Sequence, residues 1–331
     1  MYERFYDLRE RPFGLTSNLR YLLMTPKHQE ALCNLEYGIA SRTGITLMVG
    51  EAGTGKTTLI RKVLAPYMQH PAVNRARWVY LNNPTLSQQE FLEFLAHGFQ
   101  LGADAADSKP RFLRALERVL AECRENGIVT ALVIDEAQSL SHELLEEVRL
   151  LANFESDTEK LLAVMLAGQP VLASRLNEPQ LGQLKQRIAL RCVLPALDLR
   201  ETAIFIAHRI SLSGGNPARV FSRDAVLAIY EHSGGIPRTI NVICDNALLS
   251  GFAAGSQPVG PEIVLEVCRD FDLQAQVGFN GSASPRPCSE FGTERVASGA
   301  RSHGARVRGL GFGMSTARRQ PPLSDGAAIR Q

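Results

Sequence analysis

The sequence has few cysteines, no long apolar run and almost no net charge. Its six cysteines are scattered, without a C-x-x-C pair or a neighbouring histidine cluster. This argues against a disulfide scaffold or a zinc site and favours buried thiols in a reducing compartment. No apolar run approaches the roughly 18 residues of a membrane span, and residues 1–6 lack the apolar core of a signal peptide. We therefore expect a cytoplasmic protein with no direct membrane span, one that a partner could recruit to the inner membrane.

The small positive charge is unevenly distributed along the chain. The net charge is +2, but residues 276–331 carry eight arginines against three acids, or +5, which leaves 2 − 5 = −3 for residues 1–275. The basic excess therefore belongs to the C-terminal stretch. A strongly cationic DNA-binding face on the folded body is not supported by these charges.

Strands alternate with helices over the first two thirds of the chain. Apolar, β-prone runs are centred on residues 45–49, 78–81, 130–134 and 161–167, and the run at 130–134 is continuous, as in a strand buried on both faces. Helical patterns lie between them, one of which opens with a capping box of Ser87 and Glu90. This alternation predicts an α/β fold with a doubly wound parallel sheet.

Only helical patterns follow residue 199, at about 200–212, 222–233, 238–252 and 260–271. They predict a small all-helical domain after the sheet. Gly, Ser and Arg dominate the last part of the chain, which has little periodicity and is expected to be disordered. The predicted organisation is an N-terminal segment packed on the core (1–40), an α/β domain (41–198), a helical domain (199–273) and the tail (274–331).

A G-x-x-x-x-G-K-[ST] pattern follows the first strand and opens a helix, predicted over 57–64 and ended by Pro66. In that setting, backbone N–H groups and the helix dipole face bound phosphates, so the pattern predicts nucleoside-triphosphate binding. Lys56 is expected to reach the β- and γ-phosphates, and the Thr57 hydroxyl to bind Mg²⁺. The predicted nucleotide-binding residues are Gly50, Glu51, Ala52, Gly53, Thr54, Gly55, Lys56, Thr57 and Thr58.

A second acidic motif ends the buried strand at 130–134. Asp135 is placed to hold the Mg²⁺ shell, and Glu136 to act as the general base toward water. An ordinary acidic pair capping the next helix is the alternative for this pair considered alone. Beside a phosphate loop, the pair favours hydrolysis of ATP over nucleotide sensing.

Many further short motifs occur along the chain in a fixed order. They include Phe5-Tyr6-Asp7-Leu8, Pro12-Phe13, Asp135-Glu136-Ala137-Gln138, Leu150-Leu151-Ala152-Asn153-Phe154-Glu155, Gly168-Gln169-Pro170, Gln186-Arg187-Ile188 and Gly235-Ile236-Pro237-Arg238. Over about residues 1–272 these motifs resemble an AAA+ ATPase, and more narrowly the ATPase domain of the general secretion pathway protein A (ExeA) type. Similar domains accompany exosortase loci, and more distant ones drive transposition.

The resemblance implies roles for residues outside the two motifs. Gln169 matches sensor 1, which orients water or the γ-phosphate; a turn-forming residue before Pro170 is the alternative. Arg238 matches sensor 2 of a helical lid, and a solvated arginine at a helix start is its alternative. Arg187, preferred over Arg191, is a candidate arginine finger for a neighbouring subunit, unless it is an ordinary surface residue.

It further implies that Pro12, Phe13 and His28 lie near the adenine, or else only pack the N-terminal segment on the core. Secretion-type members continue into a transmembrane helix and a peptidoglycan-binding domain. Here an Arg/Gly/Ser-rich stretch follows instead, so anchoring and cell-wall binding are not expected.

The sequence thus predicts a P-loop AAA+ ATPase with a helical lid, which binds ATP and Mg²⁺, forms homo-oligomers and does mechanical or assembly work on a partner. The first hypothesis for that partner is an envelope secretion or export assembly. The alternative is a DNA-associated regulator similar to transposition ATPases. A third reading is a nucleotide-gated switch with negligible turnover.

Overall fold

The computed structural model describes residues 1–69, 75–82 and 84–275. The chain divides into two units, Met1–Phe279 and Asn280–Gln331, and the structure below is that of the first. The predicted tail therefore lies outside the described residues, apart from residues 274 and 275.

The first unit is built on one parallel five-stranded sheet with the order β2-β3-β4-β1-β5. Its strands are β1 (Ile45–Gly50), β2 (Ala76–Leu81), β3 (Val129–Ile134), β4 (Ala163–Gly168) and β5 (Ile188–Leu194). The predicted doubly wound fold is confirmed, and β5 is an addition. The sequence did not predict β5 because it is an edge strand. Its first four residues are all partly or fully exposed, so its apolar pattern is weak.

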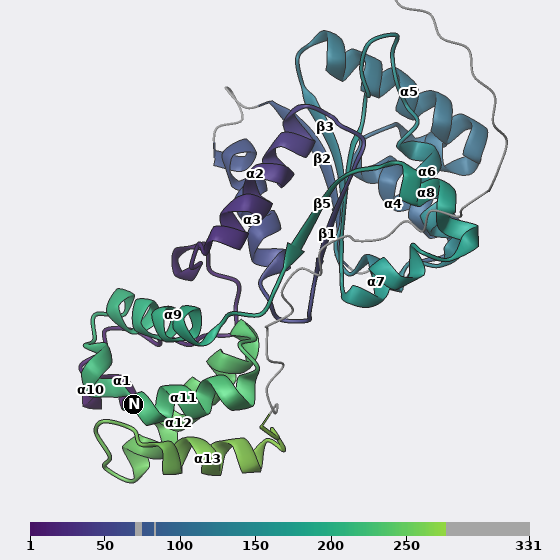
Figure 1. The fold of residues 1–331 in the computed structure, drawn as a ribbon. Coiled ribbons are helices and arrows are strands. Elements are labelled where there is room, and N and C mark those ends of the chain that lie inside the picture. The colour runs from purple at the N-terminus through teal and green to yellow at the C-terminus, as the bar shows by residue number, and fades with distance from the viewer. Residues whose placement is uncertain (70–74, 83, 276–331) are drawn as a thin grey trace, which may run out of the picture. The chain divides into compact units, whose positions relative to one another are not determined.

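Helices cover both faces of the sheet (Figure 1). On one face, α2 (Pro26–Ala40) and α3 (Lys56–Gln69) pack through a cluster of buried apolar residues. The other face is covered by α4 (Gln88–Gly98), α5 (Lys109–Glu125), α6 (His142–Leu151), α7 (Pro170–Arg175) and α8 (Gly182–Gln186). The short 3₁₀ helices are η1 (Leu19–Tyr21), η2 (Ala103–Asp107), η3 (Ala137–Ser139) and η4 (Pro179–Leu181).

Two helix boundaries test the sequence reasoning directly. The capping box at α4 is confirmed, since the Ser87 hydroxyl accepts from the Glu90 N–H and the Glu90 carboxylate accepts from the Ser87 N–H. The predicted end of the phosphate-loop helix is wrong, because α3 continues through Pro66 to Gln69. Proline removes only one helical hydrogen bond, and here the last turn continues beyond it.

The helical part after the sheet comprises α9 (Leu199–Leu212), α10 (Pro217–Val220), α11 (Arg223–Ser233), α12 (Pro237–Ala253) and α13 (Pro261–Asp270). It has an apolar core of its own, distinct from the clusters on the two faces of the sheet. The four helices predicted after residue 199 are confirmed as α9, α11, α12 and α13.

The N-terminal segment packs partly into the apolar core of the helical part and partly onto the sheet. The short α1 (Tyr2–Phe5), with Tyr6, Leu8 and Phe13, packs into the helical core, whereas α2 packs on the sheet. The expectation that all of residues 1–40 pack on the α/β core is thus corrected for residues 2–13. Their large aromatic side chains find the matching apolar surface on the helical part.

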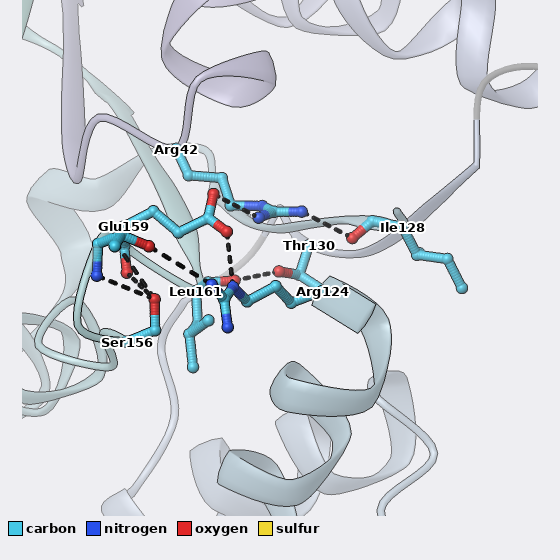
Figure 2. A network of polar contacts seen from close by, with 8 residues as sticks. Arg42, Arg124, Ile128, Thr130, Ser156, Glu159 and Leu161 are labelled. Carbon is cyan, nitrogen blue, oxygen red and sulfur yellow. Dashed lines mark hydrogen bonds and ion pairs between the residues drawn. The ribbon is translucent and has the colours of Figure 1, made fainter. Parts of the chain in front are cut away.

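A polar network joins three loops at the amino edge of the sheet (Figure 2). The Arg42 guanidinium donates to the Ile128 carbonyl (3.0 Å) and the Glu159 carboxylate (3.2 Å), and Arg124 donates to the other oxygen of Glu159 (2.6 Å). These contacts fasten the starts of β1, β3 and β4 together. They stabilise the edge opposite to the phosphate loop, whose residues follow the end of β1.

No helix in the described part of the chain combines the length and the apolarity that crossing a membrane requires.

Candidate functional site

The phosphate loop connects β1 to α3 at the carboxyl edge of the sheet. Within it, the Thr54 hydroxyl donates to the Glu51 carbonyl (2.9 Å) and narrows the turn. Gly53 has a φ of +85°, and a Cβ built there would lie 2.7 Å from the Cβ of Arg238. Glycine is required at 53 because the backbone is left-handed and the helical part of the chain approaches it closely.

Lys56 is buried inside the loop, with 4% of its surface exposed. Its ammonium group donates to the carbonyls of Gly50 (2.9 Å) and Glu51 (3.0 Å). Burial lowers the pKa of Lys56, while the charges of Glu136 and Asp135 act in the opposite direction. A desolvated ammonium at the N-terminus of a helix is suited to bind phosphate oxygens.

The two residues predicted to hold Mg²⁺ lie in contact. The Thr57 hydroxyl donates to the Asp135 carboxylate (2.6 Å), and Asp135 has only 2% of its surface exposed. Tyr80, at the end of β2, donates to the same carboxylate oxygen (3.2 Å), and burial followed by the Asp135 charge raises its pKa, so it remains a donor. One carboxylate and one hydroxyl fit Mg²⁺, which takes one or two protein ligands and completes its shell with phosphate and water.

Glu136, directly after Asp135, adopts a left-handed backbone conformation with φ 51° and ψ 38°. Its carboxylate accepts from the side-chain amides of Gln138 (2.5 Å) and Gln169 (3.3 Å). Burial would raise the pKa of Glu136, but these two hydrogen bonds and the Lys56 charge outweigh it and lower the pKa. The structure therefore brings Gln169 to Glu136 and adds Gln138, which sequence reasoning left without a role.

Arg238 comes from the helical part and reaches the phosphate loop through its backbone. Its N–H donates to the Gly53 carbonyl (3.3 Å), at the first turn of α12. Its exposed side chain lines the same pocket as Lys56 and Glu136. Arg238, the residue expected at the sensor-2 position, thus lies beside the phosphate loop.

The loop, the N-terminal segment and the helical part enclose one pocket of about 280 Å³. The helical part contributes Leu197, Phe205, Arg209, Pro237, Arg238 and Asn241. Opposite the phosphate loop lie residues 14–18 and 21–23 of the N-terminal segment. A pocket that combines the phosphate loop with apolar side chains such as Leu22, Leu23 and Phe205 suits a nucleotide.

The residues expected near the adenine are only partly in place. His28 lines the pocket; its Nδ1 contacts the Thr25 hydroxyl (2.8 Å), and burial lowers its pKa. Pro12 and Phe13 do not line it: Phe13 is buried in the helical core, with its ring 6.2 Å from that of Phe221. Residues 14–18 and 21–23 line the pocket instead; apart from the short η1 they are irregular chain, which no apolar motif could indicate.

Arg209 of α9 is a pocket residue that sequence reasoning missed. It donates to the Pro12 carbonyl (2.8 Å), and its guanidinium lies over the rings of Tyr21 (5.1 Å) and Phe205 (4.7 Å). Burial lowers its pKa to about 10. Arg209 thereby links the N-terminal segment to the helical part, beside Tyr21 and Phe205 in the wall of the pocket. No sequence motif signals this role, because its partners are a backbone carbonyl and two distant aromatic rings.

Arg187 and Arg191 lie away from the pocket of their own chain. Arg187 precedes β5, whose first residue, Ile188, pairs with Ile45 at the start of β1. It is therefore at the amino edge of the sheet, roughly 16 Å from the phosphate loop at 3.3 Å per strand residue. Both arginines are exposed. The structure does not bring them together with the other predicted site residues.

The comparisons with known proteins agree with this geometry. A family model described as an AAA domain matches residues 39–176. General secretion pathway protein A of Aeromonas hydrophila is 39% identical over 260 residues, which cover 78% of this chain and 46% of that protein. The chain thus spans about half the length of this relative.

Solved structures of low identity share the fold. Cdc6p from Pyrobaculum aerophilum superposes with a TM-score of 0.59 at 19% identity, and the match covers 78% of this chain and 70% of the Cdc6p chain. The ORC2 protein of Aeropyrum pernix, in a structure of its ADPNP-ADP complexes, gives 0.56 at 19% identity, covering 79% and 71%. The relative and the family model, together with the phosphate loop, the acidic end of β3 and the helical part around one pocket, show that the chain belongs to the AAA+ family of P-loop proteins, of the general secretion pathway protein A type.

Proposed function

We propose that this chain hydrolyses ATP with Mg²⁺ in the pocket between the phosphate loop and the helical part. The observation that carries the proposal is the 2.6 Å hydrogen bond from Thr57 to Asp135. It joins two oxygen ligands suited to Mg²⁺ beside the phosphate loop, next to a carboxylate that can accept a proton. Asp135 and Glu136 are adjacent in the chain. The left-handed backbone at Glu136 directs the two carboxylates apart, so that Asp135 can hold Mg²⁺ while Glu136 accepts a proton.

Each residue has a definite task in this reaction. Lys56 and the backbone N–H groups of the loop offset the charge of the β- and γ-phosphates. Glu136 accepts the proton of the water whose oxygen attacks the γ-phosphorus, while the bond to the bridging oxygen breaks and ADP leaves. Gln169 orients the water or the γ-phosphate. When bound, Mg²⁺ supplies positive charge to the phosphate oxygens, and Thr57 and Asp135 hold it there.

The helical part acts as a lid in this proposal. Arg238 lies at the first turn of α12, whose backbone contacts the phosphate loop, so a γ-phosphate contact by its side chain would change the lid angle with nucleotide state. Arg187, exposed and remote from its own pocket, then serves as the finger of a neighbouring copy in a homo-oligomer. Such coupled movements do assembly or remodelling work on a partner. Similarity to general secretion pathway protein A makes an envelope secretion or export assembly the first partner to test.

The experiment compares ATP turnover of the wild type, Glu136→Gln and the control Glu125→Gln, whose carboxylate is exposed near the end of α5. Glu136→Gln is expected to bind ATP and lose turnover by about 10²-fold or more, since a general base contributes that much. The control should match the wild type. Wild-type turnover no higher than that of Glu136→Gln would contradict hydrolysis and favour a nucleotide-gated switch.

A second measurement concerns the partner. We expect duplex DNA to leave ATP turnover unchanged at both low and high salt, because residues 1–275 carry a net charge of −3. A large stimulation that disappears at high salt would contradict the secretion or export assignment.

A further inference from the structure

Gln138 bridges the two residues that stand closest to the proposed chemistry. Its Nε2 donates to Oε2 of Glu136 (2.5 Å), and its Oε1 accepts from the backbone N–H of Gln169 (3.0 Å). The Gln169 side chain closes the ring by donating to the same Oε2 of Glu136 (3.3 Å). Three residues from the ends of β3 and β4 thus form a closed hydrogen-bonded triangle.

The surrounding structure permits one orientation of the Gln138 amide. A flipped amide would set its oxygen against the Glu136 carboxylate and its NH₂ group against the Gln169 N–H, so both hydrogen bonds would be lost. Arg175 of α7 holds the backbone of η3, because its guanidinium donates to the carbonyls of Gln138 (2.6 Å) and Leu140 (2.8 Å). The Gln138 side chain is therefore held at both ends, and its backbone is anchored separately.

Gly168 supplies the space that the triangle needs. A Cβ built on Gly168 would lie 2.8 Å from Oε1 of Gln138 and 2.7 Å from a methyl carbon of Leu172. Both contacts are closer than packed atoms approach. The end of β4 therefore accommodates the Gln138 amide only because residue 168 has no side chain.

The two amides leave one oxygen of Glu136 available. Both donate to Oε2, and the described residues place no hydrogen bond on Oε1. Glu136 also keeps a left-handed backbone, which is unfavourable for a non-glycine residue and persists only where neighbours hold it. A carboxylate held by one oxygen, with the other free for water, has the geometry of an oriented general base.

We propose that Gln138 is the positioning residue of the reaction: it orients the Glu136 carboxylate and couples it to Gln169 at the end of β4. This inference rests on the proposed function, in which Glu136 is the general base. Gln138 acts through Glu136, since both ends of its amide are already engaged by Glu136 and by the Gln169 backbone. Its loss should therefore affect turnover and leave ATP binding unchanged.

The test measures turnover and ATP affinity of Gln138→Met, which keeps the length of the side chain without its amide. We expect kcat to fall about 10- to 100-fold, as for a misplaced catalytic group, with the Kd for ATP within twofold of the wild type. The control, Gln183→Met on the exposed surface of α8, should match the wild type. Gln138→Asn, too short to reach both partners, replaces the methionine variant if that fails to fold.

The double variant Glu136→Gln/Gln138→Met separates the two proposals. If Gln138 acts through Glu136, Gln138→Met lowers the residual turnover of Glu136→Gln no further. An equal loss in both backgrounds, a wild-type kcat in Gln138→Met, or faster turnover in that variant would each overturn the positioning role while the function stands. Full activity of Glu136→Gln alone would instead refute the general base, and the role of Gln138 with it.

Discussion

Gly235 is the residue at which the coupling between the sheet and the helical part can be tested most sharply. It has a φ of +72°, and a Cβ built on it would lie 1.9 Å from the Leu197 carbonyl oxygen and 2.9 Å from the carbonyl carbon. The Leu197 N–H donates to the Gly235 carbonyl (2.9 Å). This contact pairs the chain that leaves β5 with the turn that leads into α12.

The substitution Gly235→Ala combines three costs. The left-handed backbone costs an alanine about 1 kcal/mol. Losing the Leu197 hydrogen bond costs about 1 kcal/mol more, and displacing backbone that has no room to move costs about 1–3 kcal/mol. We expect the free energy of unfolding to fall by about 3–5 kcal/mol.

Gly255 provides the matched control. Its φ is +64°, and a Cβ there would meet nothing within 4 Å. Gly255→Ala therefore carries the backbone cost alone, about 1 kcal/mol. Urea denaturation of both variants isolates the combined cost of the steric displacement and the lost Leu197 hydrogen bond as the difference of about 2–4 kcal/mol between them.

The same variants report on function. The Gly235 turn precedes Arg238, whose N–H contacts Gly53 of the phosphate loop. Displacing that turn should lower ATP turnover in Gly235→Ala and leave it unchanged in Gly255→Ala. Equal unfolding midpoints for the two variants would refute the tight contact with Leu197. Equal turnover, with Gly235→Ala folded, would refute the coupling of the turn to the phosphate loop.

Three further outcomes are expected. Lys56→Ala removes the buried ammonium of the phosphate loop and should weaken nucleotide binding at least tenfold by calorimetry; unchanged affinity would refute the placement of the site. Asp135→Asn keeps the side-chain shape but removes the charge beside Thr57, so titration with Mg²⁺ should require a higher concentration for half-maximal turnover, and an unshifted curve would argue against this ligand. Tyr2→Phe removes the hydrogen bond to the Asp245 carboxylate and should lower the free energy of unfolding by about 1–2 kcal/mol, whereas Tyr37→Phe, at a residue 58% exposed, should not change it; equal urea midpoints would show that the N-terminal anchor adds no stability.

The phosphate loop and the acidic end of β3 could be predicted from sequence because both are local. The glycines, Lys56 and Thr57 are consecutive or nearly so, and a buried strand followed by Asp135 and Glu136 has a recognisable apolar pattern. Parallel strands bring their carboxyl ends to one edge of a sheet, so the two motifs had to lie close together once the α/β alternation was recognised. The order of the strands adds that β1 and β3 are both neighbours of β4.

What the residues do to one another was decided by the tertiary structure. Gln138 acquires its role because β4 sets a glycine and the Gln169 N–H opposite its amide. Arg209 meets Pro12 and Tyr21 only because the N-terminal segment returns across the pocket. These contacts join residues far apart in sequence through single hydrogen bonds and ring faces, which leave no periodic trace in the chain. The sequence by itself therefore determined the phosphate loop, its acidic partner and the α/β class, whereas side-chain packing decided how the proposed base is held and what encloses the nucleotide pocket.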